Sequence, residues 1–212
     1  MRVKAVIFDL GGVVLDSPLE AIADYERRKG LPPDFLNRLI ARMGSQGAWS
    51  RLETGKVSLE DFFEAFDAEA ASCGAPISSR ELMDEIAKYA QPRPAMIEAI
   101  RRLRRAGFRV AALTNNWVMD GPLAEGMNLL KAEFDVFIES SRTGLQKPDP
   151  RIYELTLQEL GIEPEESVFL DDIGRNLKTA RQLGMATIKV SDPEAALAEL
   201  EEIVGIPLRT AG

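Results

Sequence analysis

The stretch "VIFDLGGVVLD", residues 6–16, joins an apolar run to an acidic residue and a glycine pair. The run that ends at Asp9 is almost continuously apolar, which is typical of a strand buried on both faces of a parallel sheet. Asp9 would then lie at the carboxyl end of this strand, where open α/β sheets bind their ligands. Gly11 and Gly12 have no Cβ, so the backbone beyond Asp9 can approach a ligand closely. The stretch therefore predicts the first strand of an α/β fold, with a ligand site at its end.

Further runs of the same apolar, β-branched kind recur along the chain. They are "FRVAAL" (108–113), "DVFIE" (135–139), "SVFL" (167–170) and "ATIKV" (186–190). Helical patterns accompany them at 93–107, 149–161, 176–184 and 192–205, most of them ending on a glycine. Alternation of strands and helices predicts a Rossmann-like α/β core with a mostly parallel five-stranded sheet and right-handed crossovers.

The region between the first two predicted strands has helical patterns only. A capping-box pattern, "SPLE" (17–20), begins it, and further helical patterns follow at 32–44, 58–70 and 79–90. The proline-rich "AQPRP" (90–94) marks the return to the core. The sequence thus predicts a helical cap domain of residues 16–90, inserted into a core domain of residues 1–15 and 91–212.

Composition excludes several classes of function. The formal net charge of −8 and the pI of about 4.8 disfavour nucleic acid and anionic membranes as partners. With one cysteine and no histidine, the chain has no intrachain disulfide, no Ser-His or Cys-His catalysis and none of the commonest zinc ligands. No apolar run reaches membrane-spanning length, and we expect a cytoplasmic protein.

Reactive polar groups occur where the predicted strands end. Asp9 ends the first strand, "TNNW" (114–117) ends the second, and Asp171 and Asp172 end the fourth, while Lys147 lies in the loop "GLQKPDP" (144–150). Each group alone is readily explained as a turn, a helix cap or a solvated loop residue. Together they supply what one phosphoryl-transfer site needs, and we interpret them as such a site.

The acidic groups suit a nucleophile and a metal. Asp9 can attack phosphorus and form an aspartyl phosphate. Asp9, an acidic residue of the 171–172 pair and the backbone carbonyl of Gly11 can hold Mg²⁺, a hard cation that prefers oxygen ligands. Adjacent side chains leave a strand in opposite directions, so we expect only one of Asp171 and Asp172 to ligate the metal directly.

The remaining groups suit the phosphate. The Thr114 hydroxyl and the backbone amides near Asn115 can bind phosphoryl oxygens. Lys147 can neutralise the charge that develops during transfer. Gly12 leaves room for the ligand beside the backbone.

These motifs resemble those of the haloacid dehalogenase superfamily. "FDLGG" is similar to its first motif, "LTNNW" to its second, "KPDP" to its third and "FLDDIGRN" to its fourth, and the resemblance runs from residue 3 to about residue 208. More narrowly, the chain resembles the N-terminal phosphatase-like domains of soluble epoxide hydrolases and of some acyl-CoA dehydrogenase fusion proteins. The epoxide-opening activity belongs to a separate domain, for which this chain has no room. The resemblance implies a Mg²⁺-dependent phosphatase acting on a small phosphorylated metabolite.

Residue by residue, the resemblance implies that Asn116 and Trp117 line the site beside Asn115. It favours Asp172 as the direct metal ligand, with Asp171 turned toward Lys147 or a metal-bound water.

The chain departs from the family at Gly11, where most family phosphatases have an aspartate that acts as general acid and base. Loss of such a group typically costs roughly 10²–10⁴-fold in rate, so a slow phosphatase is expected. Asp16 is an alternative proton donor, although a turn residue before Ser17 explains it better.

Two other functions stay open: a metal-independent 2-haloacid dehalogenase, and a non-catalytic binding protein that keeps the fold. In the cap, the segment 42–56 is expected to be loop-rich and to face the site. Arg42, Trp49 and Arg51 are its candidate substrate contacts, or else surface and packing residues. The sequence is compatible with a monomer or a homodimer.

Overall fold

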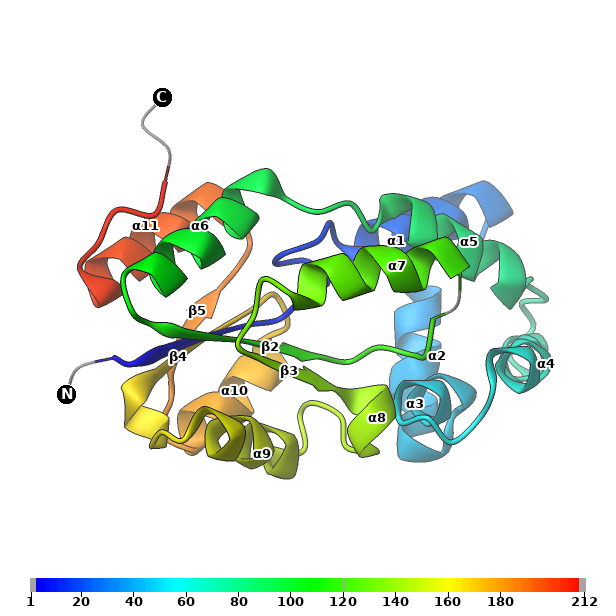
Figure 1. Ribbon diagram of the computed structural model, residues 1–212. Coiled ribbons are helices and arrows are strands. Elements are labelled where there is room, and N and C mark those ends of the chain that lie inside the picture. The colour runs from blue at the N-terminus through cyan, green and yellow to red at the C-terminus, as the bar shows by residue number, and fades with distance from the viewer. Residues whose placement is uncertain (1–2, 120, 210–212) are drawn as a thin grey trace.

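The computed structural model describes residues 3–119 and 121–209, so the predicted core domain extends past both described ends. Its centre is a five-stranded sheet in the order β3-β2-β1-β4-β5 (Figure 1). All neighbouring strands pair in parallel, which confirms the predicted fold class. The strands are β1 (Ala5–Phe8), β2 (Arg109–Thr114), β3 (Val136–Glu139), β4 (Ser167–Asp171) and β5 (Ala186–Lys189).

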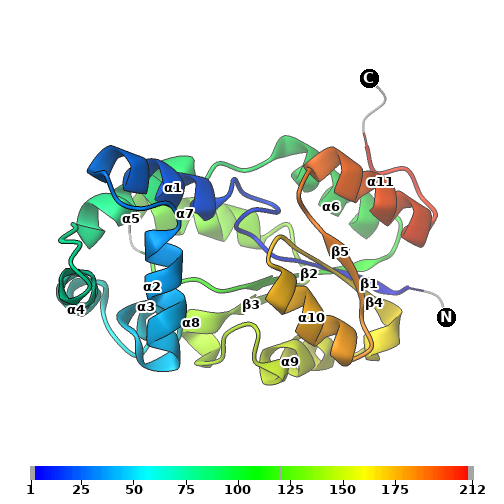
Figure 2. The ribbon, with the colours of Figure 1, turned by 180° about the vertical axis from the view of Figure 1, so that it is seen from behind.

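Helices cover both faces of the sheet, as Figure 2 shows. One face packs against α6 (Pro94–Arg105), α7 (Gly121–Lys131) and α11 (Pro193–Val204), and the other against α9 (Pro150–Leu160) and α10 (Gly174–Gln182). A one-turn helix, α8 (Ser140–Thr143), follows β3, and the 3-10 turn η2 (Pro164–Glu166) precedes β4. Helices on both faces bury the sheet, which explains its near-continuous apolar strands.

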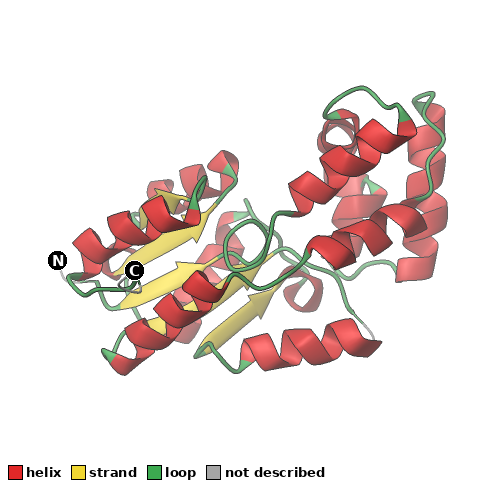
Figure 3. Ribbon diagram, turned by 90° about the horizontal axis from the view of Figure 1, so that it is seen from above, coloured by secondary structure: helices red, strands yellow, loops and turns green. Residues whose placement is uncertain are grey.

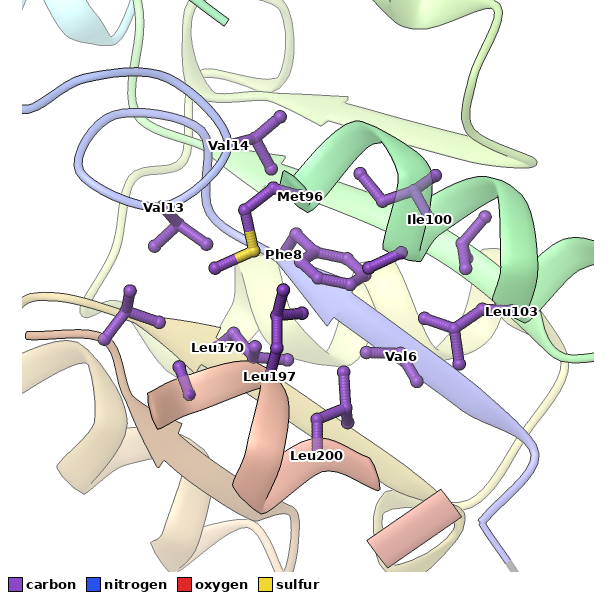
Figure 4. Close-up of a cluster of buried hydrophobic side chains, with 14 of the residues drawn as sticks. Val6, Phe8, Val13, Val14, Met96, Ile100, Leu103, Leu170, Leu197 and Leu200 are labelled. Atoms are coloured by element: carbon purple, nitrogen blue, oxygen red, sulfur yellow. The ribbon is translucent and has the colours of Figure 1, made fainter. Parts of the chain in front are cut away.

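The side chains of β1 alternate between the two halves of the core. Val6 and Phe8 pack with Met96 and Leu197 on one face, as seen in Figure 4, whereas Ile7 packs on the opposite face. Successive side chains of a strand point to opposite faces, so a four-residue strand anchors both layers. The central place of β1 brings its carboxyl end between those of β2 and β4.

A bundle of helices lies between β1 and α6 and has a hydrophobic core of its own. We call residues 18–89 the helical insert; Figure 3 shows it as a separate lobe beside the sheet. Its helices are α1 (Pro18–Lys29), α2 (Phe35–Met43), α3 (Ala48–Glu53), α4 (Leu59–Ser72) and α5 (Ser79–Tyr89), with the 3-10 turn η1 (Gly44–Gln46) before α3. The expectation that segment 42–56 is mainly loop is wrong, because α3 occupies its centre.

Paired linkers and α3 join the insert to the core. The entering and returning segments are hydrogen-bonded to each other, from Asp16 N to Gln91 O at 3.0 Å and from Arg93 N to Val14 O at 2.9 Å. In α3, the Ser50 hydroxyl donates to Gln146 Oε1 at 3.0 Å. The insert is therefore seated on the edge of the sheet where the strands end. Within the described ranges, no helix combines the length and the apolar character needed to cross a membrane.

Candidate active site

Asp9 follows β1 directly and is buried, with 7% of its surface exposed. Its backbone N–H donates to Leu170 O at 2.9 Å, so the sheet pairing with β4 continues to this residue. Asp9 Oδ1 accepts a hydrogen bond from Leu10 N at 2.7 Å and lies 2.8 Å from Lys147 Nζ. Among the described residues, no donor is bonded to Oδ2. One carboxylate oxygen is thus fixed in place, and the other remains available for chemistry.

Lys147 connects the first and fourth strand ends. Its ammonium lies 2.8 Å from Asp9 Oδ1 and 2.8 Å from Asp171 Oδ2, and the residue is only 2% exposed. Burial alone would lower the pKa of Lys147, but the two carboxylates outweigh it and raise the pKa, so the lysine stays cationic. Its backbone is held by Asn115, whose Oδ1 accepts from Lys147 N at 2.8 Å and whose Nδ2 donates to Lys147 O at 3.1 Å.

The two neighbouring aspartates after Leu170 have different surroundings. Asp171 is fully buried and engaged: Lys147 and the Asn176 amide bind Oδ2 at 2.8 and 3.0 Å, and Ile173 N donates to Oδ1 at 2.7 Å. Asp172 Oδ1 is buried but has no hydrogen-bond partner. Burial and the nearby Asp171 raise the pKa of Asp172 to about 6. Asp171 therefore fixes the lysine, and Asp172 keeps an oxygen free.

A divalent cation suits this cluster. One carboxylate oxygen from each of Asp9, Asp171 and Asp172 lies within 4.8 Å of the others. Burial raises the pKa of Asp9 well above its ordinary value, Lys147 opposes this effect, and the two other aspartates add to it. Three carboxylates face one ammonium, and a buried oxygen of Asp172 has no donor. A hard cation would supply both the missing charge and the missing partner.

Gly12 permits this arrangement. Its φ is +77°, and a Cβ at this position would lie 2.3 Å from Asp172 Oδ2. Its carbonyl accepts from Arg93 Nη1 at 2.8 Å. A Cβ on Gly11 would approach Pro18 Cδ at 3.1 Å, so a larger residue there must displace the start of the helical insert slightly.

The residues at the end of β2 and just after it have different roles in the fold. Thr114 is 3% exposed and ends β2 next to β1, beside the end of Asp9's strand. The side chain of Asn116 is used within the fold, since its Nδ2 donates to Glu139 at 2.8 Å and its Oδ1 accepts from Ser141 at 2.9 Å. That amide therefore holds the loop in place, and both of its polar atoms already have partners within the protein. Trp117 instead packs edge-on against Trp49 of the insert, with ring centroids 6.4 Å apart.

The three candidate substrate contacts of the insert lie in different places. Trp49 lies in α3 and packs against Trp117 as well as against Phe62 and Phe66 of its own bundle. Arg42 lies at the far side of α2, beside Cys73, and Arg51 is exposed. Trp49 thus lies at the junction with the core, where it contacts Trp117.

Sequence reasoning missed Glu53, the last residue of α3. Trp49 Nε1 donates to Glu53 Oε1 at 3.0 Å, and the carboxyl is half-buried. Burial raises the pKa of Glu53, while Trp49, Lys147, Arg175 and Asn115 counteract part of the shift. The spacing of Trp49 and Glu53 was a usable signal, because residues four apart share one face of a helix.

The fold and the site define an α/β protein of the doubly wound class, with a lysine–carboxylate cluster at the carboxyl edge of its sheet. The chain belongs to the haloacid dehalogenase-like hydrolase family, whose model matches residues 3–184.

Relatives agree with this assignment over nearly the whole chain. Mouse acyl-CoA dehydrogenase family member 10 is 39% identical over 211 residues, covering 97% of this chain and 19% of the relative. Pig bifunctional epoxide hydrolase 2 is 37% identical over 221 residues, covering 98% of this chain and 40% of the relative. The chain thus spans less than half the length of either protein. Sesquiterpene phosphatase astK of Aspergillus oryzae is 27% identical, with 95% of this chain and 97% of the relative covered.

Solved structures share the fold. A predicted HAD-like family hydrolase from Porphyromonas gingivalis superposes with a TM-score of 0.71 at 22% identity, covering 96% of this chain and 98% of the other. A HAD family enzyme from Bacteroides thetaiotaomicron, in complex with magnesium and inorganic phosphate, has a TM-score of 0.61 at 18% identity, covering 88% and 93%.

Proposed function

We propose that the protein is a Mg²⁺-dependent phosphatase that hydrolyses a small phosphomonoester through an aspartyl phosphate on Asp9. One observation carries the proposal: Lys147 fixes one oxygen of Asp9, while the neighbouring Asp172 keeps a buried oxygen without a donor. The proposed nucleophile thus lies in one cluster with a carboxylate oxygen that is free to bind a hard metal ion. The phosphatase named among the relatives, and the magnesium and phosphate bound by a protein of the same fold, support this function.

The charge of the carboxylate cluster explains why a cation is needed. Three carboxylates and one lysine would together repel a phosphate dianion from Asp9. Asp9, Asp172 and the Gly11 carbonyl would hold the Mg²⁺, and Asp171 would act through Lys147. A bound Mg²⁺ would neutralise the carboxylates and polarise the phosphoryl group.

Different residues of the chain then have different roles in the reaction. Oδ2 of Asp9, which has no donor among the described residues, attacks phosphorus while Lys147 holds Oδ1. The Thr114 hydroxyl and the Asn115 backbone N–H bind the transferring phosphoryl oxygens, and Lys147 stabilises the charge that develops there. Asn116 and Gly12 shape the loops around the phosphate, and Trp117 carries the contact with the insert.

The helical insert is the proposed cap domain, with residues 16–90 as the cap and residues 1–15 and 91–212 as the core. Its paired linkers and its α3 contact suit a lid that closes over the strand ends and excludes water. We place the protein in the cytoplasm, as a monomer or homodimer, with neither nucleic acid nor membrane as partner. The single cysteine and the net charge of −8 support that placement.

The first test is p-nitrophenyl phosphate turnover with Mg²⁺ and with EDTA, in the wild type, Asp9→Asn and Gly11→Asp. We expect activity that EDTA abolishes and that Asp9→Asn lowers by at least about 10³-fold. Asp84→Asn, on the exposed side of α5, is the matched control and should retain activity.

The same experiment distinguishes the alternatives. Absence of turnover on this substrate and on a panel of phosphorylated metabolites, even in Gly11→Asp, would leave a non-catalytic binding protein. Metal-independent halide release from a 2-haloacid would instead establish a dehalogenase, although the buried free oxygen of Asp172 has no use in that reaction.

A further inference from the structure

The loop after β1, which lies wholly within the described residues, offers no free proton donor for the proposed chemistry. Gly11 has no side chain, and Asp16, the next acidic residue after it along the chain, is ion-paired with Arg93. Asp16 Oδ1 accepts from Arg93 Nε at 3.1 Å, and its side chain is 45% exposed. The same arginine holds the Gly12 carbonyl, so this ion pair fastens the loop after β1. Departure of an alkoxide therefore needs an acid from another part of the molecule.

The helical insert brings one carboxyl to the site. Glu53 is half-buried at the end of α3, where Trp49 Nε1 donates to its Oε1 at 3.0 Å. From the core side, the charges of Lys147 and Arg175 and the Asn115 amide lower the pKa of Glu53 and oppose the effect of its burial. Lys147 itself lies 2.8 Å from Asp9. The charge of Lys147 thus acts on both Glu53 and the nucleophile.

Contacts of α3 with the core fix this position. The hydroxyl of Ser50 donates to Gln146 Oε1 at 3.0 Å, next to Lys147 in the sequence. Gly55 fits so closely that a Cβ would lie 2.3 Å from Ser141 O. A carboxyl at the end of α3 is therefore held against the site by contacts on both sides of it.

We propose that Glu53 is the general acid and base of this site, in place of the carboxylate that Gly11 lacks. The inference rests on the proposed phosphatase function, and it makes the insert supply a catalytic residue. It also predicts that the chemistry is complete only while α3 is seated on the core.

The environment of Glu53 suits both roles. Burial raises its pKa, which favours a carboxyl that holds a proton, and the indole, the amide and the two cations limit the rise. A group that can both donate and accept a proton near the working pH is the more effective acid–base catalyst.

The proton and bond changes balance over two steps. In the first, Asp9 forms a bond to phosphorus, the bond to the leaving oxygen breaks, and the Glu53 proton passes to that oxygen to give an alcohol. In the second, water attacks phosphorus and gives a proton to the Glu53 carboxylate. The bond between phosphorus and Asp9 breaks, inorganic phosphate leaves, and both side chains return to their initial states.

A series of aryl phosphates with increasingly basic leaving groups tests the first step. We expect Glu53→Gln to lower kcat for phenyl phosphate by roughly 10²–10⁴-fold, and to lower release of p-nitrophenol in a single turnover much less. For phenyl phosphate, the wild-type kcat should fall as pH rises through the Glu53 pKa, and this limb should vanish in the variant. Glu64→Gln, exposed on α4, is the matched control.

Trapping of the phosphoenzyme tests the second step. With p-nitrophenyl phosphate, Glu53→Gln should release one equivalent of nitrophenol in a burst. It should also accumulate a phosphate on Asp9, detected by mass spectrometry after acid quench.

Equal losses for every leaving group, with an unchanged pH profile and no trapped phosphate, would overturn the proposal and make Glu53 a structural residue. Unaltered kinetics would overturn it as well. If the proposed phosphatase function itself is wrong, the wild type will show no Asp9-dependent turnover. That result is distinct from every outcome that overturns the role of Glu53.

Discussion

Single residues set which carboxylate oxygens at the strand ends are engaged and which are free. Lys147 pairs with both Asp9 and Asp171, whereas Asp172 Oδ1 is buried without a hydrogen-bond partner. The types and order of these residues were predictable, because parallel strands end at one edge of the sheet. The direction of Asn116 was not, because its partners Glu139 and Ser141 belong to another strand and a later helix.

Gly12→Ala should weaken Mg²⁺ binding by at least about 10-fold, as loss of outer support for a ligand commonly does. A Cβ would lie 2.3 Å from Asp172 Oδ2 and would displace that ligand. Calorimetric titration with Mg²⁺ measures the effect. Gly74→Ala is the control, because its φ of +79° matches the +77° of Gly12 but its Cβ would meet nothing within 4 Å. Equal affinity in both variants would contradict a ligand role for Asp172.

Elements form where tertiary contacts add to local preference. The glycines of "MGSQGAW" (43–49) made this segment look like a loop in the sequence. The helix that forms there, α3, has only six residues and would be marginal in isolation. Burial of Trp49 and Leu52 stabilises it in the bundle. By contrast, α11 was predictable, since Asp192 caps it by accepting from Ala195 N at 2.8 Å and a proline follows.

Glu201, near the end of α11, holds the segment that follows the helix. Its carboxylate accepts from Leu208 N, Arg209 N and the Arg209 guanidinium, and these bonds lower its pKa from 4.5 to about 2. A lowered folded-state pKa stabilises the fold above the unfolded value, and this contribution fades as pH falls from 4.5 toward 2. Glu201→Gln should therefore lower Tm at pH 7, with the deficit shrinking over that acid range.

Thermal unfolding followed by circular dichroism at several pH values measures this deficit. Glu202→Gln, on the neighbouring exposed position, is the control and should follow the wild type. A deficit that stays constant down to the lowest pH would show that the Glu201 charge contributes nothing.

At the scale of the whole molecule, the proposed acid–base role of Glu53 depends on how the insert sits on the core. Gly55 lies close to the core in that contact, with φ at +65° and Ser141 O only 2.3 Å from the position of a Cβ. Its neighbour Glu53 lies two residues earlier, so a shift at Gly55 moves the proposed acid.

Gly55→Ala should lower kcat for phenyl phosphate and increase cleavage by protease in the linkers, because the insert can no longer seat fully. Gly30→Ala is the control: its φ of +67° imposes a similar backbone cost, about 1–2 kcal/mol, but nothing lies within 4 Å. Both variants should lose stability, and only Gly55→Ala should lose turnover. Equal kinetics in the two would show that seating of the insert does not limit the reaction.

The sequence by itself determined the parallel sheet, the helical character of residues 18–89, and the order in which reactive groups follow the strands. Apolar runs, helix caps and strand ends are local properties, so they can be read without coordinates. Only the tertiary structure decided which oxygens stay free, that Asn116 turns to Glu139, and that Ser50 of α3 bonds to Gln146 of the core. These contacts join residues far apart in the chain, and close packing of the insert against the core sets them.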